Sequence, residues 1–474
     1  MCNVAALLLV LLSLTALCAI VVPPIKAGSK TIFVPTDYNT IQGAVDHASS
    51  GDTVFVWSGT YTESVSINKS VSLIGENKDK TMILGDWRLG GTVVLVSHDG
   101  VTVKGFTIRS VADNTHGDSI RGVHLLHVHN CNVSDCVLLG NGFGVWLYES
   151  SGNIIEDNFV DGQFSTGRVP LSGIQLEESA YNRVLGNAVT DNAVGVTLSA
   201  SFGNNLTGNF LTNNYSGINV GSSDNNTIMD NSIFSKRYGI TQTSSSNNII
   251  LNNALSGNPT GIQISLSCFN LVEGNVIDHS SYCGLELHDD ASHNNVIGNN
   301  IIQNKDGVEV KFSSNNTLKN NNITANEGIG AVFEEASNNL IYKNNFINNG
   351  LHASNSESRN TWDASGKGNY WDNYTGTDID NNGIGETPYI IDESNRDNYP
   401  LTEIATTQDF QHEDTSPTPT TAPSSTITAP SSEMLTTPPF PTVLVAVAAA
   451  IGLGIIVYFT KIKKNQSINA TKGS

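Results

Sequence analysis

Positive charge is scarce in this chain of 474 residues. It has 24 Lys and Arg residues against 44 Asp and Glu residues, for a formal net charge of −20, and only 14% of its residues are charged. A surface with this excess of negative charge repels a phosphate backbone, so we expect no nucleic-acid partner. The balance fits a protein that works outside the cell.

Cysteine is rare as well. Two of the six cysteines, Cys2 and Cys18, fall in an apolar N-terminal run. The other four are Cys131, Cys136, Cys268 and Cys283. Three interpretations stay open for Cys131 and Cys136: small buried residues at turns, a disulfide, or a thiol metal pair.

Long apolar runs occur only near the two ends of the chain. Residues 4–22 read as a secretory signal peptide, or as an uncleaved anchor because no positive charge precedes them. Residues 443–460 are uncharged and precede three lysines, which predicts a membrane-spanning helix with a cytoplasmic C-terminus. The Ser-, Thr- and Pro-rich segment before it predicts an extended stalk. We therefore expect a single-pass protein with its main domain outside the cell.

These features divide the chain into seven segments. We expect a signal peptide (1–27), an N-terminal cap with the first coils (28–90), a repeat region (91–353), a C-terminal cap (354–404), a stalk (405–440), a transmembrane helix (441–460) and a cytoplasmic tail (461–474).

The repeat region is marked by a recurring glycine. Successive intervals are 22, 29, 22, 22, 22, 22, 23, 23 and 23 residues. The glycines are Gly122, Gly144, Gly173, Gly195, Gly217, Gly239, Gly261, Gly284, Gly307 and Gly330. A fixed period of this length indicates stacked units that bury their apolar faces against each other.

Each unit reads as short strands joined by asparagine turns. After Gly195, Val196 and Leu198 alternate with polar Thr197, as in a strand with one buried face. Asparagine follows the glycine at offset nine (for example Asn204) and at offset fourteen, where it suits a left-handed turn and can bond along a stack. The Leu-x-x-Leu-x-Leu spacing of leucine-rich repeats is absent. We predict an all-β fold, a right-handed parallel β-helix of about 12–13 coils.

Both ends of the repeat region carry distinctive sequences. Residues 31–50 predict a strand and a short helix that would cap the first coil. Residues 37–75 resemble the opening of NosD-like and related carbohydrate-binding and sugar-hydrolase β-helix domains. Residues 368–392, with Asp397–Leu401, are similar to the C-terminal end of the same family. The resemblance implies a secreted or periplasmic β-helix; some members are linked to copper delivery to nitrous oxide reductase, and others are surface proteins of unassigned role.

One outward face could bind a ligand. The residues two after each glycine form a polar strip that begins at His124 and Trp146 and ends at Glu286 and Glu309. Insertions before Gly122 and Gly173 should emerge on the same edge. We expect a glycan-binding cleft there, with aromatic rings stacking on sugars. Its candidate residues are Arg121, His124, Trp146, Tyr148, Arg168, Gln175 and Glu177.

Catalysis and metal delivery are the alternatives. Asp118 and Glu177 are the candidate catalytic carboxylates, but no polygalacturonase, pectin esterase or alginate epimerase motif is recognisable, so a non-enzymatic role is favoured. Five histidines between residues 98 and 129 could bind copper or zinc, although hydrogen-bonded turn histidines are the favoured interpretation. They are His98, His116, His124, His127 and His129.

A calcium site is predicted near the C-terminal end. Asp378, Asp380 and Asn382, followed by Gly383 and Glu386, resemble the first half of a Ca²⁺ loop, although position twelve is Tyr389 where a glutamate is expected. Eight Asn-x-Ser/Thr motifs before the predicted stalk also indicate a glycoprotein: Asn68, Asn132, Asn205, Asn214, Asn225, Asn315, Asn322 and Asn373. Taken together, we expect a surface β-helix that recognises carbohydrate or has a structural role in the envelope.

Overall fold

The computed structural model describes residues 28–86, 91–111, 120–162 and 171–405, which belong to one compact unit. The predicted signal peptide, the stalk beyond residue 405, the membrane helix and the tail lie outside these ranges, as do Asp118, His116 and Arg168. Within them, none of the helices has the length and apolarity needed to cross a bilayer.

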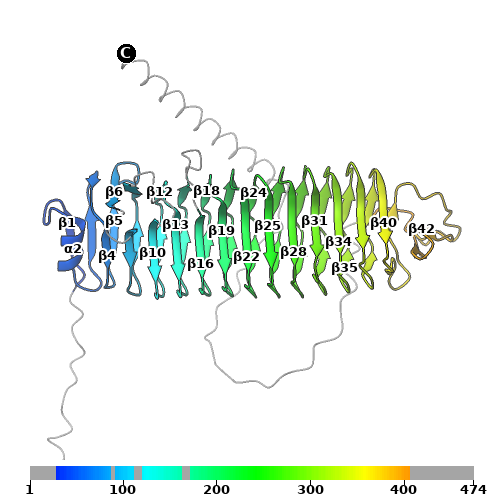
Figure 1. Ribbon diagram of the computed structural model, residues 1–474, viewed down its shortest axis with the longest axis horizontal. Helices are drawn as coiled ribbons and strands as arrows, with labels where there is room; N and C mark the ends of the chain where they lie inside the picture. The colour runs from blue at the N-terminus through cyan, green and yellow to red at the C-terminus, as the bar shows by residue number, and fades with distance from the viewer. Residues whose placement is uncertain (1–27, 87–90, 112–119, 163–170, 406–474) are drawn as a thin grey trace, which may run out of the picture. The chain divides into compact units, whose positions relative to one another are not determined.

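Three parallel sheets wind around one core (Figure 1). Sheet A has 14 strands, from β1 (Thr31–Val34) to β38 (Leu340–Tyr342). Sheet B has 14, from β3 (Gly59–Tyr61) to β41 (Tyr370–Trp371). Sheet C has 13, from β4 (Val65–Ile67) to β40 (Leu351–Ser356). The predicted parallel β-helix is confirmed, with about 14 coils rather than 12–13, because the first coils lack the repeated glycine and escape a count based on it.

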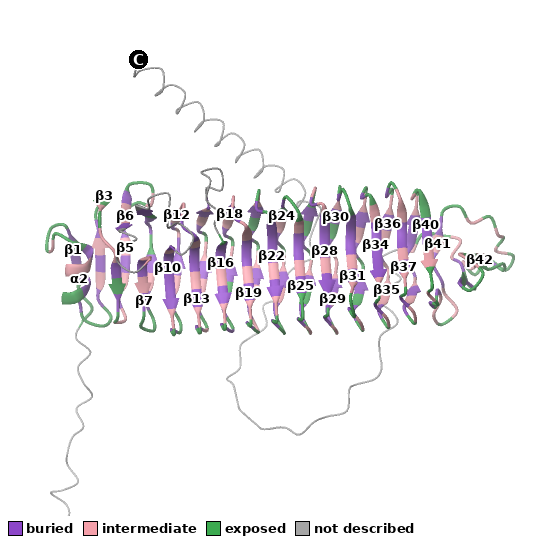
Figure 2. Cartoon of the chain, viewed as in Figure 1, coloured by how far each residue is buried: buried purple, intermediate pink, exposed green. Residues whose placement is uncertain are grey.

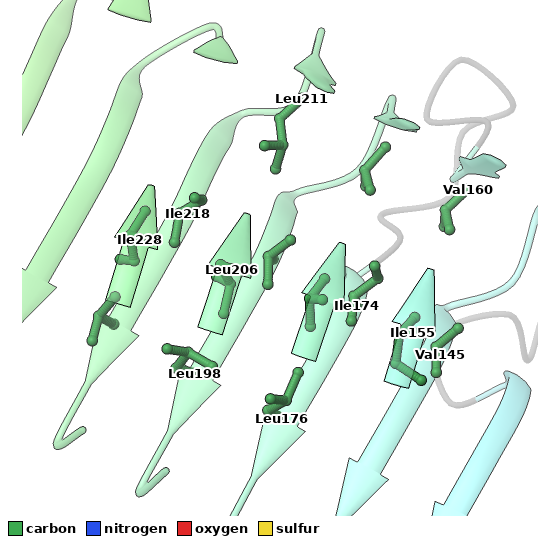
Figure 3. Close-up of a cluster of buried hydrophobic side chains, with 14 of the residues drawn as sticks. Val145, Ile155, Val160, Ile174, Leu176, Leu198, Leu206, Leu211, Ile218 and Ile228 are labelled. Carbon is green, nitrogen blue, oxygen red and sulfur yellow. The ribbon is translucent and has the colours of Figure 1, made fainter. Parts of the chain in front are cut away.

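A typical coil contains one long strand and two short ones. After β19 (Val194–Ser199) of sheet C come β20 (Asn205–Thr207) of sheet A and β21 (Phe210–Thr212) of sheet B. Val196 and Leu198 are fully buried, as predicted, and the buried positions alternate with outer ones throughout (Figure 2). Equivalent side chains stack from coil to coil, as Val145, Ile174 and Ile218 do in Figure 3.

The repeated glycine sits where the chain turns from sheet B into sheet C. A Cβ atom at Gly195 would lie 2.4 Å from Leu211 Cδ2 and 2.7 Å from the carbonyl oxygen of Gly217 in the next coil. No side chain fits at such a corner without pushing the coils apart. The glycine period therefore follows from the coil-to-coil distance rather than from backbone flexibility.

Equivalent asparagine side chains form rows along the stack, and each row joins successive coils through buried hydrogen bonds. We call such a row an asparagine ladder and each member a rung. Asn231 Oδ1 accepts from Asn209 N at 2.9 Å and from Asn209 Nδ2 at 2.9 Å. Asn231 Nδ2 donates to the carbonyl of Leu206 at 3.0 Å and to Asn253 Oδ1 at 2.9 Å. Every polar atom of this amide is satisfied although the residue is only 1% exposed.

The ladders differ from expectation in two respects. The left-handed residue is the one before most of the ladder asparagines, such as Asp230 (φ 56°) before Asn231, while the ladder asparagine itself keeps an ordinary φ within the described residues. Sequence reasoning also missed a third asparagine ladder, which includes Asn192 and Asn214, and a serine ladder, which includes Ser201 and Ser223. Ser235 and Ser280 interrupt the third asparagine ladder, whereas the residues of the serine ladder follow the same 22-residue period as the other ladders and were overlooked.

Cys131 and Cys136 occupy the first rungs of two ladders. The amide of Cys131 donates to Asn153 Oδ1 at 2.8 Å, and that of Cys136 donates to Asn158 Oδ1 at 3.0 Å. Both residues are buried with free thiols, and Cys268 and Cys283 are free as well. The interpretation as small buried turn residues is confirmed.

The predicted N-terminal helix forms as α2 (Ile41–His47). Thr40 caps it by accepting from Gly43 N at 3.1 Å, and Ile41, Ala44 and Val45 are buried. The Gln42 amide accepts from Ser66 N at 2.7 Å and donates to Ser66 O at 3.2 Å, so it takes the place of a neighbouring strand beside β4. That the helix α2 caps the whole stack stays a prediction.

At the other end, the ladders finish on residues of the family-like C-terminal segment. Asn395 Oδ1 accepts from Asn360 N at 2.9 Å, and Asp397 Oδ2 accepts from Asn369 N at 2.6 Å and Trp371 Nε1 at 2.9 Å. Burial raises the pKa of Asp397 to about 6 in spite of these bonds. This segment replaces the next coil with side chains that satisfy the last rungs.

We expect Asn231→Ala to lower the free energy of unfolding by about 2–4 kcal/mol, because it leaves Asn209 N buried without a partner and removes the side-chain bonds to Leu206 O and Asn253 Oδ1. Urea unfolding followed by circular dichroism measures it. The control is Asn219→Ala on the outer face of sheet C, expected within about 0.5 kcal/mol of wild type. Equal unfolding midpoints for the two variants would show that the ladder does not stabilise the stack.

Candidate functional site

Three neighbouring strands of sheet C carry the predicted cleft. They are β10 (Arg121–Leu126), β13 (Phe143–Tyr148) and β16 (Ser172–Glu177). His124, Trp146 and Gln175 lie side by side in register, as do Leu126, Tyr148 and Glu177. The structure therefore brings together the described members of the predicted set.

Trp146 is not the free aromatic platform that the sequence predicts. Its ring stacks with His124 (centroids 5.1 Å apart, 24° between planes) and packs against Phe143 (4.8 Å). The guanidinium carbon of Arg121 lies 4.1 Å from the Trp146 ring centroid. Sequence reasoning missed Phe143, whose position before a repeated glycine would have placed it here. Tyr148, edge-on to Trp146 at 6.3 Å, is half-buried and forms the outer aromatic surface.

Three buried nitrogen atoms of this cluster lack hydrogen-bond partners within the described part of the chain. They are Arg121 Nε, His124 Nε2 and Trp146 Nε1. His124 is 9% exposed although it points outward from sheet C, because its neighbours cover it. Unpaired polar atoms at such depth cost about 1–3 kcal/mol each, so three of them in one place distinguish this part of sheet C.

Two basic side chains of this cluster, Arg121 and His124, differ in their charge. Burial, together with the charges of Arg121 and His127, lowers the pKa of His124 from 6.5 to about 4. Burial also lowers the pKa of Arg121, an effect that Glu177 opposes. At neutral pH, His124 is therefore an uncharged imidazole beside the Arg121 cation.

The remaining histidines do not converge. His127 Nε2 lies 3.4 Å from Glu149 Oε2, His129 Nδ1 lies 2.6 Å from Ser151 Oγ, and His98 Nδ1 lies 2.9 Å from the carbonyl of Asp99. Each described imidazole of the predicted cluster thus has its own neighbour. They form no group in which three ligating atoms could share one metal ion within the described residues.

Farther along sheet C, Glu286 and Glu309 stand side by side, as the period predicts. Their repulsion is relieved within the sheet: Gln263 Nε2 donates to Glu286 Oε2 at 2.7 Å, and Lys311 Nζ lies 2.9 Å from Glu309 Oε2. Glu309 is 4% exposed, and burial raises its pKa despite Lys311. Neutralisation by Lys311 accounts for this pair without a bridging cation.

The predicted calcium loop does gather its carboxylates. Ligating atoms of Asp378, Asp380 and Glu386 all lie within 4.8 Å of one another, which no other group of three acidic, His or Cys side chains achieves among the described residues. Asn382 Nδ2 donates to Asp380 Oδ2 at 2.9 Å, and Gly383 takes a positive φ of 85° at the turn. Carboxylate and amide oxygens on a tight turn suit a hard divalent cation.

These features define a right-handed parallel β-helix with a polar cluster on one sheet and an acidic loop at its C-terminal end. A family model described as "Periplasmic copper-binding protein (NosD)" matches residues 45–236 and 222–376. The chain belongs to the NosD family.

Solved structures with similar coils include the Dettilon tailspike protein gp208, at 16% identity and TM-score 0.46, covering 64% of this chain and 66% of that one. The A-module of the Azotobacter vinelandii mannuronan C-5 epimerase AlgE6 is 15% identical, with TM-score 0.43, covering 68% and 95%. A mannuronic acid-specific polysaccharide family 6 lyase from human gut microbiota is 13% identical, with TM-score 0.46, covering 69% and 91%. No curated protein matches the chain.

The pKa of His124 predicts a pH-dependent stability that originates at this cluster. Unfolded His124 takes up its proton near pH 6.5 and folded His124 only near 4, so the contribution is complete above pH 6.5 and is lost as the pH falls toward 4. The loss amounts to about 3 kcal/mol. Urea unfolding of wild type and His124→Gln at pH 7 and pH 4.5 measures it, since the difference between the proteins cancels the opposite contribution of Asp397. Parallel pH profiles would contradict a buried, neutral His124.

Proposed function

We propose that this NosD-family protein recognises glycans through the face of sheet C around Arg121, Trp146 and Tyr148. The observation that carries the proposal is the cluster of three unpartnered nitrogen atoms beside half-exposed polar side chains. Sugar hydroxyls can accept from the N–H groups of Arg121 and Trp146 and donate to a neutral imidazole. Tyr148 adds a ring edge and face at the margin.

Gln175 and Glu177 complete the proposed binding surface. Both are half-buried on β16, in register with Trp146 and Tyr148. Beyond them the outer face of sheet C continues with short polar side chains, such as Thr197 and Asn219. A linear, mainly uncharged oligosaccharide lying across the coils suits such a strip better than a compact ligand does.

A polysaccharide-cleaving enzyme is the alternative on the same surface. Glu177 is the candidate carboxylate that the structure describes here, and its proposed partner Asp118 lies outside the described residues. Incubating the bound oligosaccharides with the protein separates the two functions, because shortened products identify an enzyme and intact sugars identify a binding protein.

The family description supports copper binding as a second function, and the acidic loop supports a structural Ca²⁺ ion. The donor sets differ: imidazoles suit copper, and the oxygens of Asp378, Asp380, Asn382 and Glu386 suit calcium. We propose calcium at the acidic loop and keep copper delivery as the alternative role for the histidines. An extracellular or periplasmic location agrees with both, and attachment by a membrane helix at 441–460 is part of the proposal.

Trp146→Phe tests glycan recognition because it keeps the ring and removes the N–H donor. We expect wild type to bind members of an array of linear oligosaccharides, and the variant to bind them about threefold to tenfold more weakly. Tyr148→Ala should weaken binding as well. Phe210→Ala, which removes a 37% exposed aromatic ring on sheet B, is the matched control and should bind normally. If no oligosaccharide is bound, or if all variants bind equally, the cluster is not a glycan site.

Asp378→Asn combined with Asp380→Asn tests the calcium loop. Isothermal titration of the wild type should show one Ca²⁺ site that the double variant loses, and EGTA should lower the melting temperature of wild type alone. Asp230→Asn, at an exposed turn elsewhere, is the control. A melting curve unaffected by EGTA would count against the site.

Titration with Cu²⁺ tests the alternative role, copper binding by the histidines. His127→Ala and His129→Ala should weaken that binding.

A further inference from the structure

The eight Asn-x-Ser/Thr motifs within the described residues are not equivalent in the fold. Asn214 is fully buried in a ladder, where its Nδ2 donates to the carbonyl of Val189 at 2.9 Å. The side chains of Asn132, Asn205 and Asn322 are half-buried and hydrogen-bonded on the sheets, and Asn373 is bonded to Tyr389. Asn68, Asn225 and Asn315 are exposed, without a side-chain hydrogen bond in the described part of the chain.

Asn225 and Asn315 occupy the same position in two different coils. Each is the left-handed residue, with φ of 57° and 60°, before a ladder asparagine at the turn from sheet C to sheet A. Four coils separate them, or about 19 Å along the stack. Their Nδ2 atoms therefore project from one ridge of turns, each followed two residues later by a threonine that begins a strand of sheet A.

The same ridge carries an apolar patch between these two asparagines. Leu266, Phe269 and Phe312 are 53%, 61% and 47% exposed. They hold left-handed turn positions with φ of 49°, 58° and 50°, where other coils have residues such as Ser222, Ser244 and Glu335. Bulky apolar side chains at such positions are strained as well as exposed, and three of them on one ridge form a patch that favours a covering group.

We propose that Asn68, Asn225 and Asn315 are N-glycosylated, and that the glycans at Asn225 and Asn315 cover Leu266, Phe269 and Phe312. The donor is a lipid-phosphate-linked oligosaccharide. Transfer forms a bond between Asn Nδ2 and the anomeric carbon, breaks the bond from that carbon to the phosphate oxygen, and releases the amide proton with the lipid phosphate. The sugar rings can then lie with their C–H faces on Phe269 and Phe312.

The test uses the full chain, exported from a host that N-glycosylates, with an appended flexible Asn-Ala-Thr tag as internal standard. Glycopeptide mass spectrometry should find sugar on the tag and on Asn68, Asn225 and Asn315, with Asn214 empty. Asn225→Gln with Asn315→Gln should remove two glycan masses. Thr227→Val with Thr317→Val should do the same while keeping both asparagines. A modified tag with all three sites empty, or a modified Asn214, would overturn the proposal.

A second measurement tests the covering. Enzymatic removal of the glycans from the folded protein should raise the fluorescence of a bound apolar dye several-fold. The rise should disappear in a variant with Leu266→Ser, Phe269→Ser and Phe312→Ser, which keeps the glycans. Unchanged fluorescence after deglycosylation would show that the glycans do not lie on the patch.

Discussion

The structure depends on hydrogen bonds that each coil can complete only with the next one. A ladder asparagine such as Asn231 is buried, and its amide is satisfied by groups from the coils on both sides. A coil formed alone would leave those groups unpaired, at a cost that exceeds the gain from its few apolar side chains. Stability is therefore shared along the stack, and both ends need substitutes for a missing neighbour. Gln42 beside β4, and Asn395 with Asp397 at the last rungs, are such substitutes.

This constraint also decides where function can lie. Inward positions are fixed by the core, and turn positions are largely fixed by the ladders and left-handed residues. The outer face of sheet C is free of both requirements. The cluster of Arg121, His124 and Trp146 lies on that face, in the coils where two ladders begin with cysteine. There the unpaired nitrogen atoms lie outside the core but beneath neighbouring side chains of the outer face.

Much of the fold could be predicted from the sequence because the period is encoded in residues with strict steric roles. Gly195 is required by contact with the next coil, and the alternation of Val196 and Leu198 fixes the register of sheet C. The site was predicted less well. Register placed His124 and Trp146 side by side, but no periodicity reveals that Trp146 turns its ring against Arg121 and Phe143. That arrangement is set by side-chain packing between two neighbouring coils, which sequence spacing does not encode.

Three buried ionisable groups with shifted pKa values lie at different places along the stack. His124 and Glu309 lie on sheet C and Asp397 lies at the last rung, whereas coils between them, such as that of β19 to β21, bury only neutral side chains. Desolvation shifts each pKa toward the neutral form, downward for His124 and upward for the two carboxyl groups. Acid therefore acts in opposite directions at the two ends: it charges the imidazole of the proposed binding face and discharges the carboxylate that closes a ladder. The two groups titrate separately because they share no interacting neighbour: Arg121 and His127 act on His124, whereas Asn369, Trp371 and Tyr399 act on Asp397.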